Sequence, residues 1–123
     1  MKKLGKITLK GASGASYRFS VYPYESEFGP TKGAVYFVTK RKEKAGGRHS
    51  HSRIYAGQTA DLSASVAGHR KSSSLQSRGP NCVCVHTEGL ESTRLEIESD
   101  LMSIYRPPGN APATPYTRAP LGL

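Results

Sequence analysis

Residues 53–71, RIYAGQTADLSASVAGHRK, give the strongest indication of the fold. They predict a short apolar strand over 53–57, a polar turn, and a helix over about 62–71 that Asp61 caps. A strand, a glycine and a helix in this order often form an anion-binding site. The helix is weakly encoded, because its serines and Gly68 are poor helix formers, and its basic residues lie only at its end.

The rest of the chain predicts further strands and one stronger helix. Apolar residues alternate with polar ones on both sides of GASG (11–14), which indicates a β-hairpin. An apolar stripe near helical period favours a helix over 90–105; it consists of Leu90, Leu95, Ile97, Leu101, Ile104 and Tyr105. The other segments are a strand over 33–41, a basic loop over 40–52, a loop over 72–80 and a strand over 81–88. This order predicts an α+β fold class, with a small mixed or antiparallel β-sheet flanked by helices and an N-terminal β-hairpin extension.

The charge of the chain favours a polyanionic partner. The 123 residues, enough for one domain, carry a formal net charge of +9. Fifteen of the 18 Lys and Arg residues, but only four of the nine Asp and Glu residues, lie within 1–78. Release of counterions makes such an excess favourable for nucleic acid, and solvated basic loops are the alternative. No apolar run has the roughly 20 residues of a membrane helix, and the N-terminus has no secretory apolar region, so a cytoplasmic protein without a membrane partner is expected.

Two cysteines alternate with valines in the predicted strand over 81–88. Cys82 and Cys84 would point to the same face as His86, so a metal site is one interpretation, but structural zinc normally has four ligands and a turn between them. A disulfide would be at its upper length limit and is rare in the cytosol. We therefore expect small apolar residues in a buried strand.

Four segments in order resemble the GIY-YIG nuclease superfamily over about residues 33–110. GAVY (33–36) opens one strand, IYAG (54–57) closes the next, YAGQTADL with a later Gly-His follows, and LEIESDLM runs into PPGN (107–110). The hairpin before them is similar to an extra β-unit of small stand-alone bacterial members. The implied organisation is an extension and linker over 1–31, a GIY-YIG-like domain over 32–110 and a flexible proline-rich tail over 111–123.

The resemblance implies a phosphodiester-cleaving site. Tyr36 and Tyr55 would be the signature tyrosines that activate a water, and Glu98 would hold one Mg²⁺ or Mn²⁺. Position 65, where the family has a catalytic arginine, is Ser65 here, and His69 stands where a histidine is often found. Such a reaction requires positive charge where the phosphate gains negative charge, and the loss of one such donor costs on the order of 10²–10³ in rate.

Other cations are candidates to replace the arginine or to bind the phosphate backbone. His69 shares the helix face of position 65, whereas Arg70 and Lys71 lie further round the helix and would need a distorted helix end. Arg48 and Arg53 lie near the half-motifs. The residues expected to contact nucleic acid are Lys40, Arg41, Lys42, Arg48, Arg53, Arg70, Lys71 and Asn110.

Three functional hypotheses follow. The first is a protein of this nuclease fold that binds nucleic acid, DNA rather than RNA, with catalysis impaired or lost. The second is an active metal-dependent endonuclease, and the third is a protein-interaction scaffold. Simpler interpretations stay open for single residues: Tyr36 and Tyr55 as core aromatics, and Glu98 as a solvated carboxylate. His49 and His51 either approach the tyrosine site or are loop residues. The oligomeric state is also open.

Overall fold

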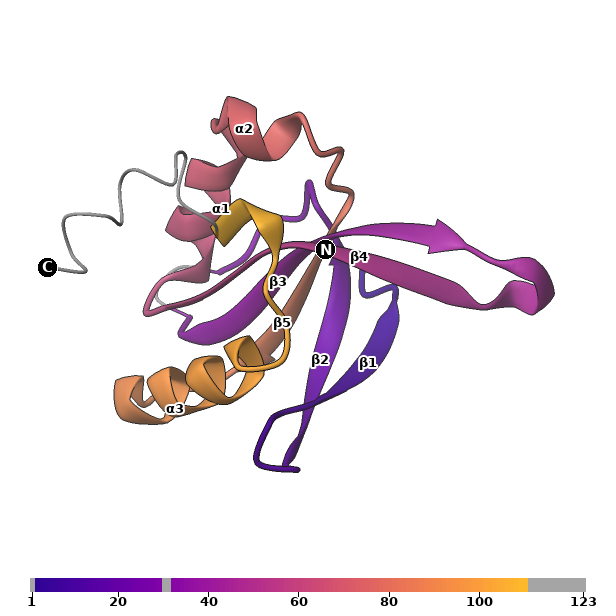
Figure 1. Cartoon of the computed structure of the whole chain (residues 1–123). Coiled ribbons are helices and arrows are strands. Elements are labelled where there is room, and N and C mark those ends of the chain that lie inside the picture. Colours follow the sequence, from indigo (N-terminus) through magenta and orange to yellow (C-terminus); the bar gives the residue numbers. More distant parts are fainter. Residues whose placement is uncertain (1, 30–31, 111–123) are drawn as a thin grey trace, which may run out of the picture.

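The computed structural model describes residues 2–29 and 32–110 and has an α+β fold built on one curled, five-stranded sheet (Figure 1). Every pairing is antiparallel, in the order β1-β2-β5-β3-β4. The sequence predicted a mixed or an antiparallel sheet, and the structure shows an antiparallel one. Its strands are β1 Gly5–Lys10, β2 Ser16–Pro23, β3 Ala34–Glu43, β4 His49–Thr59 and β5 Cys82–Thr87.

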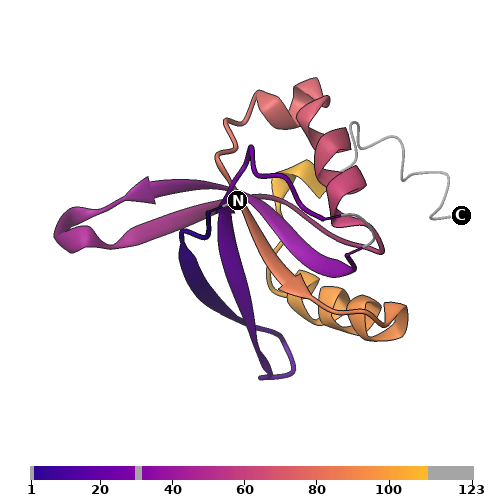
Figure 2. The ribbon, with the colours of Figure 1, turned by 180° about the vertical axis from the view of Figure 1, so that it is seen from behind.

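Helices cover both faces of the sheet, as seen from the front and from behind (Figures 1 and 2). They are α1 Leu62–Arg70, α2 Ser73–Gln76 and α3 Glu91–Met102, with the short 3-10 helices η1 Ala45–Gly47 and η2 Pro108–Asn110. Successive β3 residues alternate between the two cores, because side chains of a strand point to opposite faces. Tyr36 and Val38 pack with α1 and α2, whereas Val35 and Phe37 pack with α3. No helix of the described ranges is long and apolar enough to cross a membrane.

The N-terminal hairpin predicted from GASG is present and belongs to the same sheet. β1 and β2 pair from Gly5 opposite Val21 to Lys10 opposite Ser16, and β2 continues into pairing with β5. The turn is fastened to α3, since Asp100 accepts hydrogen bonds from the Ser13 backbone and hydroxyl groups. These contacts lower the pKa of Asp100 below its usual range.

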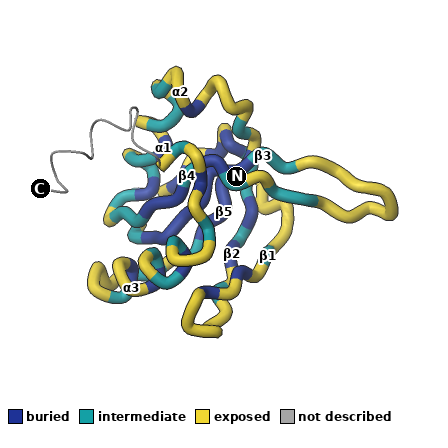
Figure 3. The backbone as a smooth tube through the Cα atoms, viewed as in Figure 1, coloured by how far each residue is buried: buried dark blue, intermediate teal, exposed yellow. Residues whose placement is uncertain are grey.

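The prediction of a basic loop over 40–52 is largely wrong, because most of this segment is strand. β5 pairs with β3 only as far as Thr39, and from there Lys40–Glu43 pair with His49–Ser52 alone. This two-stranded extension, which we call the arm (residues 40–52), projects from the sheet (Figure 1) and is mostly exposed (Figure 3). Both of its faces are polar, so the alternation that reveals a strand is missing. Its tip turns through Gly46 and Gly47, which have φ angles of 80° and 75°.

The helices confirm part of the sequence prediction and correct the rest. α1 occupies the expected range, and the Asp61 side chain accepts a hydrogen bond from the backbone of Ala64. The one-turn helix α2 lies inside the segment predicted as loop. The apolar stripe expected on α3 is only partly buried: Leu90, Leu95 and Ile104 are exposed, whereas Arg94 is buried.

Arg94 is buried because its guanidinium has several fixed acceptors. It donates to the Gln58 side chain at 2.9 Å and to the backbone carbonyls of Glu88 and Gly89 at 3.0 and 2.9 Å. A buried charge is tolerated only when hydrogen bonds replace its water. The arginine therefore ties the start of α3 to the edge strand β4, a role that periodicity alone does not reveal.

The strand predicted around the two cysteines is β5, and both thiols are buried and free. Burial raises the pKa of Cys84 to about 12, which makes it an unreactive core side chain at neutral pH. The proline-rich tail expected over 111–123 lies outside the described residues.

Candidate functional site

Tyr36, Tyr55 and His69 form an aromatic cluster where α1 packs on β3 and β4. The Tyr36 hydroxyl lies 2.6 Å from Nε2 of His69. The ring centroids of Tyr55 and His69 are 4.5 Å apart, and those of the two tyrosines are 6.2 Å apart. The structure thus brings together three side chains that the sequence analysis assigned to one site.

Gly57 allows the two tyrosines to pack this closely. It pairs with Tyr36 across the β3–β4 ladder. A Cβ at position 57 would lie 3.0 Å from the Tyr36 hydroxyl and 3.2 Å from a ring carbon of Tyr55. Any larger residue would therefore push against both rings.

Tyr36 and His69 form a neutral pair. Burial raises the pKa of the Tyr36 phenol far above its usual range, and the nearby Tyr55 and Glu98 add to this, whereas the Ser65 hydroxyl opposes it. Burial also lowers the pKa of His69. At neutral pH the phenol and the imidazole therefore share a hydrogen bond between uncharged groups, and the tautomer of His69 decides which of the two donates. Tyr36 is only 3% exposed, so it is both a core residue and a member of the cluster.

Ser65 lies beside the cluster on α1, at the position where an arginine was expected. Its hydroxyl donates to Oγ1 of Thr59 at 2.8 Å, and Thr59 in turn donates to the Asp61 carbonyl at the start of α1. This chain of hydrogen bonds fastens the turn between β4 and α1. Ser65 therefore supplies a local structural contact and no positive charge.

Glu98 lies on α3, which packs against the other face of the sheet from Tyr36. Its charge is close enough to raise the pKa of Tyr36, and partial burial raises the pKa of Glu98 itself. The described residues contain no group of three or more His, Cys, Asp or Glu side chains arranged to hold a metal ion. A single carboxylate suits only a hard cation that keeps most of its water ligands, as Mg²⁺ does.

The basic residues considered as replacements point elsewhere. Arg70 donates to the backbone carbonyls of Tyr24 and Ser26 and lies near the Tyr24 ring, so it holds the segment after β2 against α1. Lys71 is exposed at the end of α1. Within the described ranges, no cation–π contact or hydrogen bond joins an arginine or lysine to the three clustered rings.

Arg48 and Arg53 are also directed away from the tyrosines. Arg48 is exposed at the tip of the arm. Arg53 pairs with Thr39 and places its guanidinium 4.2 Å from the ring centroid of Tyr105. Tyr105 packs with the core on the α3 side of the sheet, so Arg53 lies on the opposite face from Tyr36.

Asn110, expected to contact nucleic acid, is used inside the protein. Its side chain accepts a hydrogen bond from the Ala56 amide at 2.8 Å and donates one to the Ala56 carbonyl at 2.7 Å. The Asn110 side chain thereby forms the pair of hydrogen bonds that a neighbouring strand would form with the edge of β4. These bonds hold η2 against β4. Sequence analysis missed this role because the two residues are 54 positions apart.

The arm carries the remaining basic residues. Lys40 and Lys42 lie on one of its faces, opposite Ser52 and Ser50, and Arg41 lies on the other, opposite His51. His49 and His51 share the face of Arg41 and lie on the other side of the sheet from His69. The interpretation that they approach the tyrosine site therefore fails.

Comparisons with known proteins identify no relative of this chain. No family model, curated protein or solved structure matches it.

Proposed function

We propose that this protein binds nucleic acid, DNA rather than RNA, through a nuclease-like site whose catalysis is impaired. The observation that carries the proposal is the cluster of Tyr36, Tyr55 and His69, with Ser65 where a cation is needed. The charge of Glu98 on α3 acts on Tyr36 through the pKa of the phenol. The sequence resemblance to the GIY-YIG superfamily is consistent with these positions. The exposed basic arm adds a surface for phosphate groups.

The impairment follows from the electrostatics of the cluster. A phenol acts as a base only when nearby positive charge lowers its pKa, and the pKa of Tyr36 is raised instead. A phosphodiester gains negative charge in its transition state and needs donors at that place. Glu98 would hold Mg²⁺ or Mn²⁺ if one binds, and that ion would supply the missing Lewis acid. The residues of the chain itself provide a neutral phenol and a neutral imidazole.

One contact favours a second candidate function, an active metal-dependent endonuclease. His69 Nε2 lies 2.6 Å from the Tyr36 hydroxyl, and in the tautomer with its proton on Nδ1 it accepts from the phenol, as a general base would. If a bound metal lowered the pKa of the phenol, the pair could move a proton away from an attacking water.

A cleavage experiment separates the two functions. Plasmid and single-stranded DNA are incubated with Mg²⁺ or Mn²⁺ and the native protein, Ser65→Arg, Glu98→Ala or the double variant. We expect slow or absent cleavage by the native protein and a gain of about 10²-fold in Ser65→Arg, because the restored cation stabilises the transition state. The gain should vanish when Glu98→Ala is added.

Ser63→Arg is the matched control, since it adds the same charge two residues earlier on α1. An equal gain in Ser63→Arg would show a general charge effect and contradict the assignment of position 65. Fast native cleavage that Glu98→Ala abolishes would establish the second candidate. If DNA and RNA fail to bind at low salt, both functions are excluded and a protein-interaction scaffold remains.

A further inference from the structure

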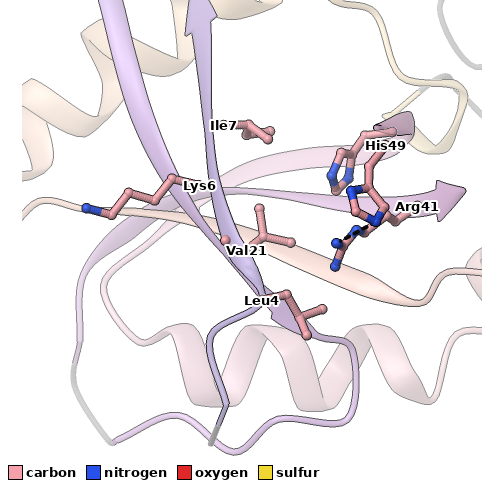
Figure 4. A pocket seen from close by; sticks show the side chains of 8 residues that line it. Leu4, Lys6, Ile7, Val21, Arg41 and His49 are labelled. Carbon is pink, nitrogen blue, oxygen red and sulfur yellow. Dashed lines mark hydrogen bonds between the residues drawn. The ribbon is translucent and has the colours of Figure 1, made fainter. Parts of the chain in front are cut away.

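A cavity lies at the base of the arm, on the face of the sheet away from the tyrosines (Figure 4). It has a volume of about 310 Å³, which is within the range of small-molecule sites. Leu4, Ile7 and Val21 form an apolar wall, and the arm contributes Arg41, His49 and His51. None of these residues belongs to the cluster of Tyr36, Tyr55 and His69.

The strand pairing within the arm explains why the side chains of Arg41, His49 and His51 lie together at the cavity. Arg41 lies directly opposite His51, and His49 is two residues from His51 on the same strand face. Asn81 fixes the base of the arm, since its side chain accepts from the Arg41 amide and donates to the Arg41 carbonyl. Arg41 Nη2 donates to Nε2 of His49 at 2.9 Å, as drawn in Figure 4. A guanidinium has five N–H donors, and among the described residues the hydrogen bond to His49 holds it in place and uses one of them.

The positive charge at this cavity is poorly compensated. Arg53 lies next along the same strand face, and its buried Nε has no hydrogen-bond partner among the residues that the structure describes. Lys6 borders the cavity through β1, but its side chain points away from Arg41 and His49 (Figure 4). The carboxylate on this face of the arm is Glu43, which lies 4.0 Å from His49 with a side chain 85% exposed.

The positive charges at the cavity affect the protonation of His51. Its Nδ1 lies 2.8 Å from the Thr39 hydroxyl and 4.0 Å from the neutral thiol of Cys84. Burial lowers the pKa of His51, and the positive charges of Arg41 and Arg53 and the neighbouring His49 lower it further. An anion in the cavity would oppose those charges and favour protonation of His51.

We propose that this cavity binds a phosphate monoester carried on an apolar or aromatic group, either a free nucleoside monophosphate or the phosphorylated end of a strand. The phosphate lies against Arg41 and His51, and the attached group lies against Leu4, Ile7 and Val21. A monoester is close to dianionic at pH 7 and has three free oxygens, which suits the forked donors of an arginine. An internal diester carries one charge and a chain on both sides, so it fits the cavity less well. The proposal goes beyond the function of the tyrosine site and does not depend on it.

The test is a titration of the full chain with adenosine 5′-monophosphate, inorganic phosphate and adenosine, followed by NMR of backbone amides and imidazoles. We expect the monophosphate to shift the signals of Arg41, His49 and His51, and adenosine to bind far more weakly. Arg41→Gln should weaken binding by about tenfold or more, because a charge-assisted hydrogen bond is lost. Lys42→Gln, which removes the same charge from the other face of the arm, should change it less than about twofold.

Several results would overturn the proposal: no shift at the cavity with millimolar monophosphate, equal weakening in both variants, or adenosine binding as well as its phosphate. His51→Gln provides a second variant if Arg41→Gln does not fold. Oligonucleotides with a 5′-phosphate or a 5′-hydroxyl distinguish the two sources, since preference for the phosphorylated strand identifies a strand end and monophosphate binding alone identifies a free nucleotide. If the protein binds nucleic acid but not the monophosphate, this inference is refuted and the proposed function stands. If it binds the monophosphate but not nucleic acid, the proposed function is refuted and this inference stands.

Discussion

Gly57 and Gly68 show how differently the fold uses the same residue type. Gly57 is buried where β4 faces the two tyrosines, and a Cβ there would have contacts of 3.0 and 3.2 Å. Gly68 is exposed on α1, and a Cβ there would meet nothing within 4 Å. The glycine of the half-motif is therefore required by packing, whereas the helix glycine is not.

The first prediction compares alanine at these two positions. Gly57→Ala should lower the free energy of unfolding by about 1–3 kcal/mol, because an overpacked core has to shift its side chains. Gly68→Ala should raise it by about 1 kcal/mol, because alanine has a higher helix propensity than glycine. Urea unfolding followed by circular dichroism measures both values. A neutral or stabilising effect of Gly57→Ala would contradict the close packing of Tyr36 and Tyr55.

At the scale of elements, the bond between Tyr36 and His69 fastens α1 to the central part of the sheet. α1 has little helix propensity of its own, so contacts like this one hold it in place. Arg70 does the same at the end of the helix through the carbonyls of Tyr24 and Ser26. The helix that carries Ser65 and His69 thus uses Arg70, its last basic residue, for structure.

The second prediction concerns the pH dependence of this attachment. The pKa of His69 is lower in the folded chain than in the unfolded chain, where it is near 6.5. In the interval between the two values the unfolded chain binds more protons, so the free energy of unfolding decreases as the pH falls through about 6.5. The native protein should therefore lose more stability between pH 7.5 and 5.5 than His69→Gln, as measured by urea unfolding at both pH values.

The comparison with His69→Gln removes the contributions of other groups. His51, whose pKa is also lowered, acts in the same direction in both proteins. Glu98, whose pKa is raised, acts in the opposite direction, again in both. Equal losses in the two proteins would mean that His69 titrates normally and is not held as a neutral partner of Tyr36.

At the scale of the whole molecule, the sequence predicted the α+β class and most of the elements, because their apolar patterns are local. The sequence analysis missed the strands of the arm because both of their faces are polar. These strands pair only with each other, so no buried face marks them in the sequence. The candidate site was predicted by residue position, and the structure does bring Tyr36, Tyr55 and His69 together. The partners of Arg70, Arg94 and Asn110 could not be predicted, because each binds a backbone or side-chain group that the fold brings close from a distant part of the chain.

The arm also determines how charge is distributed over the molecule, which leads to the last prediction. If the proposed function holds, each lysine that neutralises a phosphate contributes about 0.9 to the slope of log affinity against log salt concentration. Lys40→Gln combined with Lys42→Gln should therefore reduce that slope by about two. Lys2→Gln combined with Lys3→Gln removes the same charge from an exposed segment at the start of the chain and should leave the slope nearly unchanged. Fluorescence anisotropy with a labelled DNA duplex at several salt concentrations measures both slopes. Equal reductions would show that the net charge of +9 acts as a whole, and that the arm is not the surface on which the nucleic acid lies.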